Sequence, residues 1–251
     1  MSAATDLESS LAELACLVTG SLDLAALLGQ VAGFAQRAIP GADGAGVALL
    51  RPDDEHGRVA ALAATEPFVA ELDTAQYEVL GEGPGITASR DRRLVRSGSV
   101  GGDLRWPRFG PRAGRLGVHS ALSVPLLLPG QLIGAINIYA RGKQGFDERA
   151  AELGELFAGP AAVAVHDAQV LAQARELTGQ LQAALTSRPI IDQAVGILRA
   201  RTGATADEAL QRLRSISQRD NVKLACVAEQ LVDESVRRAR ARRGESGGRD
   251  C

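Results

Sequence analysis

The sequence predicts an α+β amino-terminal domain, in which helices flank an antiparallel sheet, followed by a connecting helix and an all-α bundle of three helices. Strand-like segments follow one another directly, with helical patterns at both ends, which is typical of α+β folds rather than of doubly wound sheets. A long helical pattern then leads to residues 187–243, where three amphipathic segments are each too short to be stable alone. The predicted divisions are a domain at 1–160, a coiled-coil helix at 161–186, a bundle at 187–236 and a disordered basic tail at 237–251.

Composition indicates a protein of the cytoplasm. The 251 residues, of which 45% are apolar, have room for about two domains. The cysteines at positions 16, 226 and 251 have no metal-ligand or redox spacing, which suits a reducing compartment. Residues 121–140 carry no charge, but the turn at 129–131 divides them into two strands of a hairpin, which argues against a membrane span. Because the first residues lack a signal-peptide pattern, we expect a cytoplasmic protein with no membrane partner.

The elements of the first domain follow from local patterns. Two amphipathic helices are expected at residues 7–18 and from a cap at Ser21 or Asp23 to about Ala38. Strands follow at 46–51 and 58–65, joined by a polar turn at 52–57. The pattern then predicts a helix at 66–76, a turn at 81–85 that opens a short helix through Ser89, short strands or extended segments at 94–96 and 100–104, an irregular segment at 106–118, and a hairpin at 119–128 and 132–139.

Several of these segments together resemble a GAF domain over residues 5 to 165. The segments that carry the likeness are GAGVALL, VAALAAT, the turn at 81–85, DLRWP at 103–107, and the hairpin SALSVPLLLPGQLIGAINIYA, with Phe146-Asp147 leading into a helix. The resemblance implies either a small-molecule pocket beside the sheet or a dimerising scaffold. We predict no cofactor, and an unidentified small-molecule ligand would belong in this domain. Because residues 17–225 contain no cysteine, the sequence excludes bilin attachment and a thiol-based sulfoxide reductase.

The connecting helix carries an apolar stripe. From Asp147 the pattern is helical almost to Ser187, and Gly159-Pro160 is expected to kink or interrupt it. Positions with a 4-3 spacing run over three heptads, broken only by Asp167: Val163, Asp167, Val170, Ala174, Leu177, Leu181 and Ala184. This spacing predicts a short parallel coiled coil and therefore a homodimer. A helix packed on its own domain would show a similar stripe.

The bundle has clear helix boundaries. Its first helix is expected to begin after Ser187, with Pro189 in the opening turn, and to end at Gly203. Thr205 and Glu208 form a capping box for the second helix, and Asn221 is a good cap for the third.

The bundle is also basic. Residues 187–243 hold 12 Lys/Arg against 7 Asp/Glu, whereas residues 1–186 hold 15 Lys/Arg against 21 Asp/Glu. A small basic module on an acidic body is typical of a phosphate-backbone binder, although the run at 237–243 would also suit a solvated tail.

Polar and apolar positions of the bundle together resemble the ANTAR family over about 50 residues. The likeness is carried by Ala184-Leu185-x-Ser187-Arg188-x-x-Ile191-x-Gln193-Ala194-x-Gly196-Ile197-Leu198, then by Ala209-x-x-x-Leu213, Ser217, Asn221-x-Lys223-Leu224 and Val227-Ala228. The resemblance implies a module that binds hairpins in nascent RNA and prevents an overlapping terminator from forming. RNA is therefore the expected partner, and the transcription machinery is a second candidate.

Eight residues are the candidate RNA contacts: Arg188, Gln193, Gly196, Arg199, Arg201, Ser217, Asn221 and Lys223. Six of them also have a structural interpretation. The arginines would suit solvated helix positions, Gly196 would suit close helix packing, Asn221 would suit capping, and Ser217 would suit bonding within its helix. The module has no aromatic residue on which to stack single-stranded bases, which favours a structured hairpin as the target.

Two other functional classes remain as alternatives. Short helices with basic faces also fit the major groove of DNA, so a DNA-binding transcription factor is the second hypothesis. The first domain could also be a small-molecule sensor scaffold without RNA binding. The sequence shows no Ser/His/Asp set, metal cluster or phosphate loop, and we therefore expect no enzyme.

Overall fold

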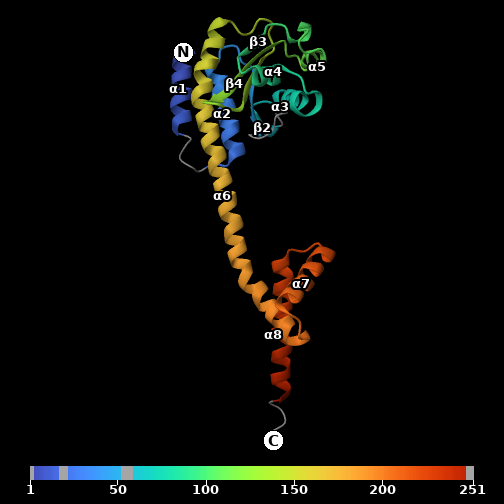
Figure 1. Cartoon of the computed structure of the whole chain (residues 1–251). Coiled ribbons are helices and arrows are strands. Elements are labelled where there is room, and N and C mark those ends of the chain that lie inside the picture. Colours follow the sequence, from blue (N-terminus) through green and yellow to red (C-terminus); the bar gives the residue numbers. More distant parts are fainter. Residues whose placement is uncertain (1–2, 17–21, 52–58, 247–251) are drawn as a thin grey trace. The chain divides into compact units, whose positions relative to one another are not determined.

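The computed structural model describes residues 3–16, 22–51 and 59–246 (Figure 1). It confirms the predicted fold class. The sheet contains β1 (Gly44–Leu50), β2 (Val59–Ala64), β3 (Val95–Ser97), β4 (Ser120–Leu128) and β5 (Gln131–Ala140), in the order β2-β1-β5-β4-β3. All neighbouring strands are antiparallel, and β4 and β5 form the predicted hairpin. The polar turn predicted at 52–57 lies outside the described residues.

One face of the sheet is covered by α2 (Leu24–Ala38) and the first part of α6 (Glu148–Thr202), and α1 (Ala3–Cys16) packs against α2 (Figure 1). Asp23, one of the two residues predicted for this role, is the N-cap of α2, because its Oδ1 accepts a hydrogen bond from the Ala26 N–H at 2.8 Å. Phe34 and Phe157 are buried with Val, Leu, Ile and Ala side chains in the core between these helices and the sheet.

The other face is covered by α3 (Pro67–Thr74), the π-helix η2 (Ala75–Leu80), α4 (Pro84–Asp91) and α5 (Phe109–Arg115) (Figure 1). Two predictions were wrong here. The segment 100–104, expected to be a short strand or extended, begins with the 3₁₀ turn η3 (Val100–Gly102), and the segment 106–118, expected to be irregular, contains α5. A carboxylate from elsewhere in the chain caps α5, because Glu82 accepts hydrogen bonds from the Arg108 and Phe109 N–H groups. This cap cannot be read from the local sequence.

Helix α6 runs without a break from Glu148 to Thr202, which corrects two further predictions. It is not interrupted at Gly159-Pro160, and no new helix begins after Ser187. A proline inside a helix removes one N–H donor and leaves the carbonyl four residues earlier without its bond. Both Pro160 and Pro189 are exposed, so water can hydrate the freed carbonyl of Leu156, which is also exposed. The helix therefore continues through these positions.

The helical unit is completed by α7 (Ala206–Asp220) and α8 (Leu224–Ser246). The predicted capping box is present, because the Thr205 N–H donates to Glu208 Oε2 at 2.9 Å and the Glu208 N–H donates to Thr205 Oγ1 at 3.3 Å. Residues 237–246, for which the sequence predicted disorder, continue α8. The Arg238–Glu234 pair, spaced by four residues, supports this extension.

The chain divides into two compact units, residues 1–173 and 174–251, and α6 contributes to both. The core of the second unit contains Ala194, Leu213, Val227 and Ala228, one or two from each of its helices. That residues 161–186 form a coiled coil with a second chain stays a prediction.

Candidate functional site

Four of the eight predicted RNA-contact residues share the exposed face of α6 in the helical unit. Arg188, Gly196 and Arg199 are separated by 8 and 3 residues, spacings that return to the same side of a helix, and Gln193 flanks them. All four are exposed, whereas Ala194 points into the core. Neither Arg188 nor Arg199 has a side-chain ion pair within the described residues, so both guanidinium groups can meet an external anion.

Gly196 lies at the centre of this face and has open space around it. A Cβ built at this position would meet no other atom within 4 Å, apart from the backbone of its own helix. Packing between helices therefore does not require glycine here. The alternative explanation of Gly196, that it allows close packing of helices, does not apply. Glycine inside an exposed helix costs about 1 kcal/mol relative to alanine, and no contact at this position among the described residues offsets that cost.

Arg201 does not belong to the same face. Its Nη2 donates to Ser235 Oγ at 2.7 Å, and the Ser235 hydroxyl in turn donates to the Leu231 carbonyl at 2.6 Å. Arg201 therefore connects the end of α6 to α8, a structural role that the sequence did not predict.

The other three predicted residues lie around the turn between α7 and α8. Asn221 is the C-cap of α7 in the left-handed conformation, with φ 51°, which corrects the expectation that it caps the third helix. Ser217 bonds within the turn, because its hydroxyl donates to the Val222 carbonyl at 2.6 Å. Lys223 is exposed and has no ion pair in the described part of the chain. Asn221 and Ser217 thus shape a turn that presents Lys223.

The sheet domain contains a buried polar cluster that the sequence did not predict. Asp73, at the end of α3, accepts three hydrogen bonds at Oδ1, from Tyr139 OH at 2.7 Å, Gln76 Nε2 at 2.8 Å and Asn137 Nδ2 at 3.1 Å. The same asparagine amide approaches Tyr77 OH at 3.3 Å, and its carbonyl accepts from Ser123 Oγ at 2.8 Å. The cluster connects α3 and η2 to the central strand β5 and its neighbour β4.

Asp73 has no cationic partner in this cluster. Its burial is complete, and desolvation raises the pKa of the carboxyl to about 7 despite the three hydrogen bonds, which act in the opposite direction. Oδ2 accepts no hydrogen bond and lies against Gly46 of β1, where a Cβ would collide with it. Burial also raises the pKa of Tyr77 and Tyr139, so both phenols stay protonated. Near neutral pH the Asp73 carboxyl is therefore close to its titration midpoint.

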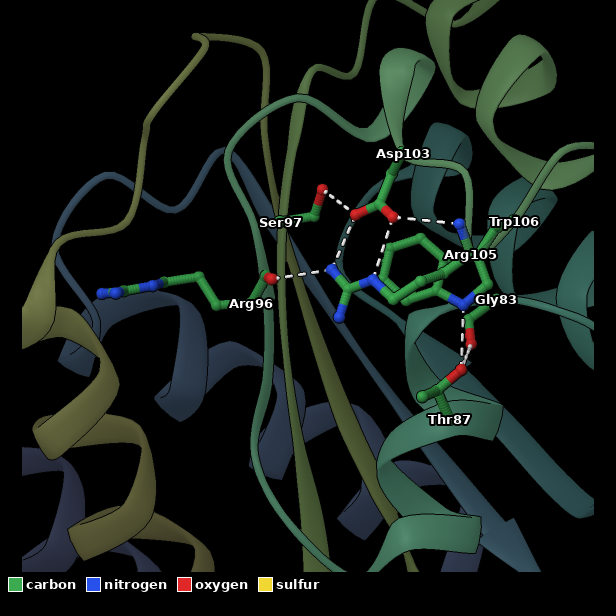
Figure 2. A network of polar contacts seen from close by, with 7 residues as sticks. All are labelled: Gly83, Thr87, Arg96, Ser97, Asp103, Arg105 and Trp106. Carbon is green, nitrogen blue, oxygen red and sulfur yellow. Dashed lines mark hydrogen bonds and ion pairs between the residues drawn. The ribbon is translucent and has the colours of Figure 1, made fainter.

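A second feature of the sheet domain is a cavity of about 440 Å³ beside the edge strand β3. It is lined by α4, by residues 93–96 and by Arg105 and Trp106. Figure 2 shows how its wall is held together: Arg105 lies between Asp103 and Arg96, and the Trp106 Nε1–H donates to Thr87 Oγ1 at 2.8 Å. Asp103, which also accepts from Ser97 Oγ at 2.8 Å, has its pKa lowered to about 2, first by Arg105, and so remains ionised.

The described residues contain no group of three or more His, Cys, Asp or Glu side chains that could hold a metal ion. No helix among them is both long and apolar enough to cross a lipid bilayer.

Comparisons with known proteins match both resemblances. The GAF domain family model matches residues 21–166, and the ANTAR domain family model matches residues 179–232. No curated protein matches the chain.

Solved structures similar to the sheet domain share its fold. The GAF domain of a phosphoenolpyruvate-protein phosphotransferase from Coxiella burnetii is 21% identical, with a TM-score of 0.52 over 71% of this chain and 99% of that one. Free methionine-R-sulfoxide reductase from Neisseria meningitidis, in complex with its substrate, is 19% identical, with a TM-score of 0.51 over 66% of this chain and 91% of that one. At these identities the likeness establishes the fold alone.

Proposed function

Since this chain belongs to the GAF domain family and carries an ANTAR domain after it, we propose that it is a signal-dependent antitermination regulator whose paired ANTAR domains bind RNA hairpins. The GAF domain would sense the signal. Binding would hold a hairpin in the nascent transcript and prevent an overlapping terminator from forming.

The observation that carries this proposal is the exposed face of α6 around Gly196. A phosphate backbone approaches most closely where a helix has no side chain, and Gln193 and Arg199 flank that position with a hydrogen-bonding amide and a guanidinium group. Arg188 extends the same face by two turns. The module has no aromatic side chain, so shape, charge and hydrogen bonds must provide the recognition.

Charge supports the same assignment. Residues 187–243 carry 12 basic and 7 acidic side chains, and Arg188, Arg199 and Lys223 are exposed without ion pairs in the part of the chain that is described. Arg219 and Arg238, by contrast, are paired with Asp220 and Glu234. Arg188, Arg199 and Lys223 are therefore among the cations of the module that can release counterions from RNA.

A second copy of the chain would pair along α6. Leu156, Val163, Val170 and Leu177 recur every seven residues and are 59%, 47%, 50% and 57% exposed. In the first unit the opposite side of the same helix is buried in the domain core, including Phe157 and Val165. A heptad-spaced apolar stripe that the domain leaves exposed is the pattern of a parallel coiled coil. Two ANTAR domains in one dimer would bind tandem hairpins with increased avidity.

The test is a gel-shift comparison of the full chain with a hairpin RNA and a duplex DNA of equal length at several salt concentrations. We expect preference for the hairpin. Arg188→Ala and Lys223→Ala should each weaken binding and reduce the log–log salt slope by about one unit, because each removes a phosphate contact. Arg115→Ala, which removes an exposed arginine of the sheet domain, is the matched control and should change neither quantity.

Preferential binding to duplex DNA would favour the alternative of a DNA-binding transcription factor. No binding to either nucleic acid would favour a small-molecule sensor scaffold.

A further inference from the structure

The cavity beside β3 is lined by residues that do not belong to the polar cluster around Asp73. Its volume of about 440 Å³ is within the range of roughly 300–1,000 Å³ that small-molecule sites occupy. Its walls come from α4, from the segment that leads into β3 and from the Asp103–Trp106 turn, all within the sheet domain.

Arg105 is a fixed cation in this wall. Its Nε and Nη2 donate to the two oxygens of Asp103 at 2.9 and 2.6 Å, and Nη2 also donates to the Arg96 carbonyl at 3.0 Å (Figure 2). Its guanidinium group stacks on the Trp106 ring, 4.3 Å from the centroid. These contacts remove the usual entropic cost of ordering an arginine, while Nη1 keeps no acceptor among the described residues.

The cavity has more donors than acceptors. Arg90 forms an ion pair through its Nε alone, 2.8 Å from Asp91 Oδ1, and Arg93 Nη2 lies 3.6 Å from Oδ2 of the same carboxylate. The remaining nitrogens of both side chains have no hydrogen-bond acceptor in the described ranges. The one other acid of the lining, Glu82, already receives two backbone N–H groups of α5. The Arg96 side chain turns away from Arg105 toward Glu148, its partner at 3.1 Å (Figure 2).

We propose that this cavity binds a small anion through a carboxylate or phosphate group, with Arg105 as the preorganised contact and Arg93 as the second. The free Nη1 of Arg105 can donate to an oxygen of either group, and charge-assisted hydrogen bonds of this kind are the strong ones. If the anion is the input signal of the regulator, that role rests on the proposed function, whereas binding itself does not.

Trp106 provides a direct measurement, because it is the single tryptophan of the chain and stacks against Arg105. The full chain is titrated with inorganic phosphate and with citrate at constant ionic strength, balanced with potassium chloride, while indole fluorescence is recorded. We expect a saturable change for at least one probe and none for chloride. Arg93→Gln should weaken that binding by about tenfold or more, since it removes a charge-assisted contact.

Two further variants make the test specific. Arg105→Lys keeps a positive charge beside Asp103 but loses the planar guanidinium group that holds Nη1 in place, and should also weaken binding by about tenfold. Arg115→Gln, at an exposed arginine outside the cavity, should leave binding unchanged. A fluorescence change that is absent, linear in concentration, or equal in the Arg93→Gln protein would overturn the proposal. A Trp106 fluorescence response to hairpin RNA, but to neither phosphate nor citrate, would also overturn it. If a variant lost anion binding but still bound hairpin RNA, the proposed function would still stand.

Discussion

At the scale of single residues, a substitution at Gly196 should change the stability of the fold and the affinity for RNA in opposite directions. Gly196→Ala should raise the free energy of unfolding of the helical unit by up to about 1 kcal/mol, because alanine is the better helix former and its methyl group meets no atom. The same methyl group should obstruct RNA and weaken binding. Thermal unfolding and gel shift on the same variant measure the two effects, which have opposite signs.

The chain offers a matched control at Gly179, which is also helical, exposed and without atoms around its Cβ position. Gly179→Ala should stabilise α6 to a similar degree and leave RNA affinity unchanged. Equal RNA affinity of the Gly196→Ala protein and the unmodified protein would remove Gly196 from the interface.

Asp73 is the second residue with a measurable consequence. Its pKa is raised in the folded state, to about 7 from 3.8, so its contribution to stability is complete below pH 3.8 and is lost as the pH rises through 7. Between pH 5 and 8 the loss should be about 2–3 kcal/mol, because each unit of pKa difference corresponds to about 1.4 kcal/mol. The neighbouring Tyr77 and Tyr139 do not titrate in this range, since burial raises their pKa values further.

Urea unfolding followed through Trp106, which is buried in the same domain, measures this dependence. Asp73→Asn should flatten the decline in stability between pH 5 and 8. If the variant and the unmodified protein lost stability in parallel, another group would be responsible.

At the scale of elements, the sequence predicted what is periodic and missed what depends on distant contacts. The hairpin β4–β5 and the cap at Asp23 follow from local patterns, and both are present. Helix α5 was missed because its cap is the distant Glu82. The polar cluster was missed because Asp73 meets Asn137 and Tyr139 only after the sheet has formed, and each residue alone has an ordinary context.

Helix boundaries show the same limit. Pro189 and Asn221 are good boundary residues in local terms, and each is used differently from the prediction. Pro189 lies inside α6, where its exposed position tolerates the missing donor, and Asn221 ends α7 instead of beginning α8. Of the predicted RNA contacts, Arg201 could not be assigned from sequence, because its bond to Ser235 depends on how α6 packs against α8.

The exposed stripe of α6 leads to a prediction about this element. Leu177→Asp places a charge at a heptad position that is 57% exposed, and the proposed coiled coil would have to bury it. The variant should therefore dissociate to monomers at concentrations where the unmodified chain is dimeric, as measured by light scattering. Gly179→Asp adds the same charge two residues later, away from the stripe, and should remain a dimer. Dissociation of both variants would indicate a general charge effect.

At the scale of the whole molecule, the acidic and basic parts of the sequence correspond to the two structural units. Residues 1–186 carry 15 basic and 21 acidic side chains, so the part that contains the sheet domain has a net negative charge, and the net positive charge of residues 187–243 is concentrated in the helical unit. Truncation after residue 186 removes the end of α6 together with α7 and α8 but keeps the heptad stripe from Leu156 to Leu177. The truncated chain should therefore stay folded and dimeric, with its Trp106 emission unchanged, and should lose hairpin binding at every salt concentration. A truncated monomer by light scattering would contradict the coiled coil, and retained hairpin binding would contradict the assignment of RNA recognition to the ANTAR domain.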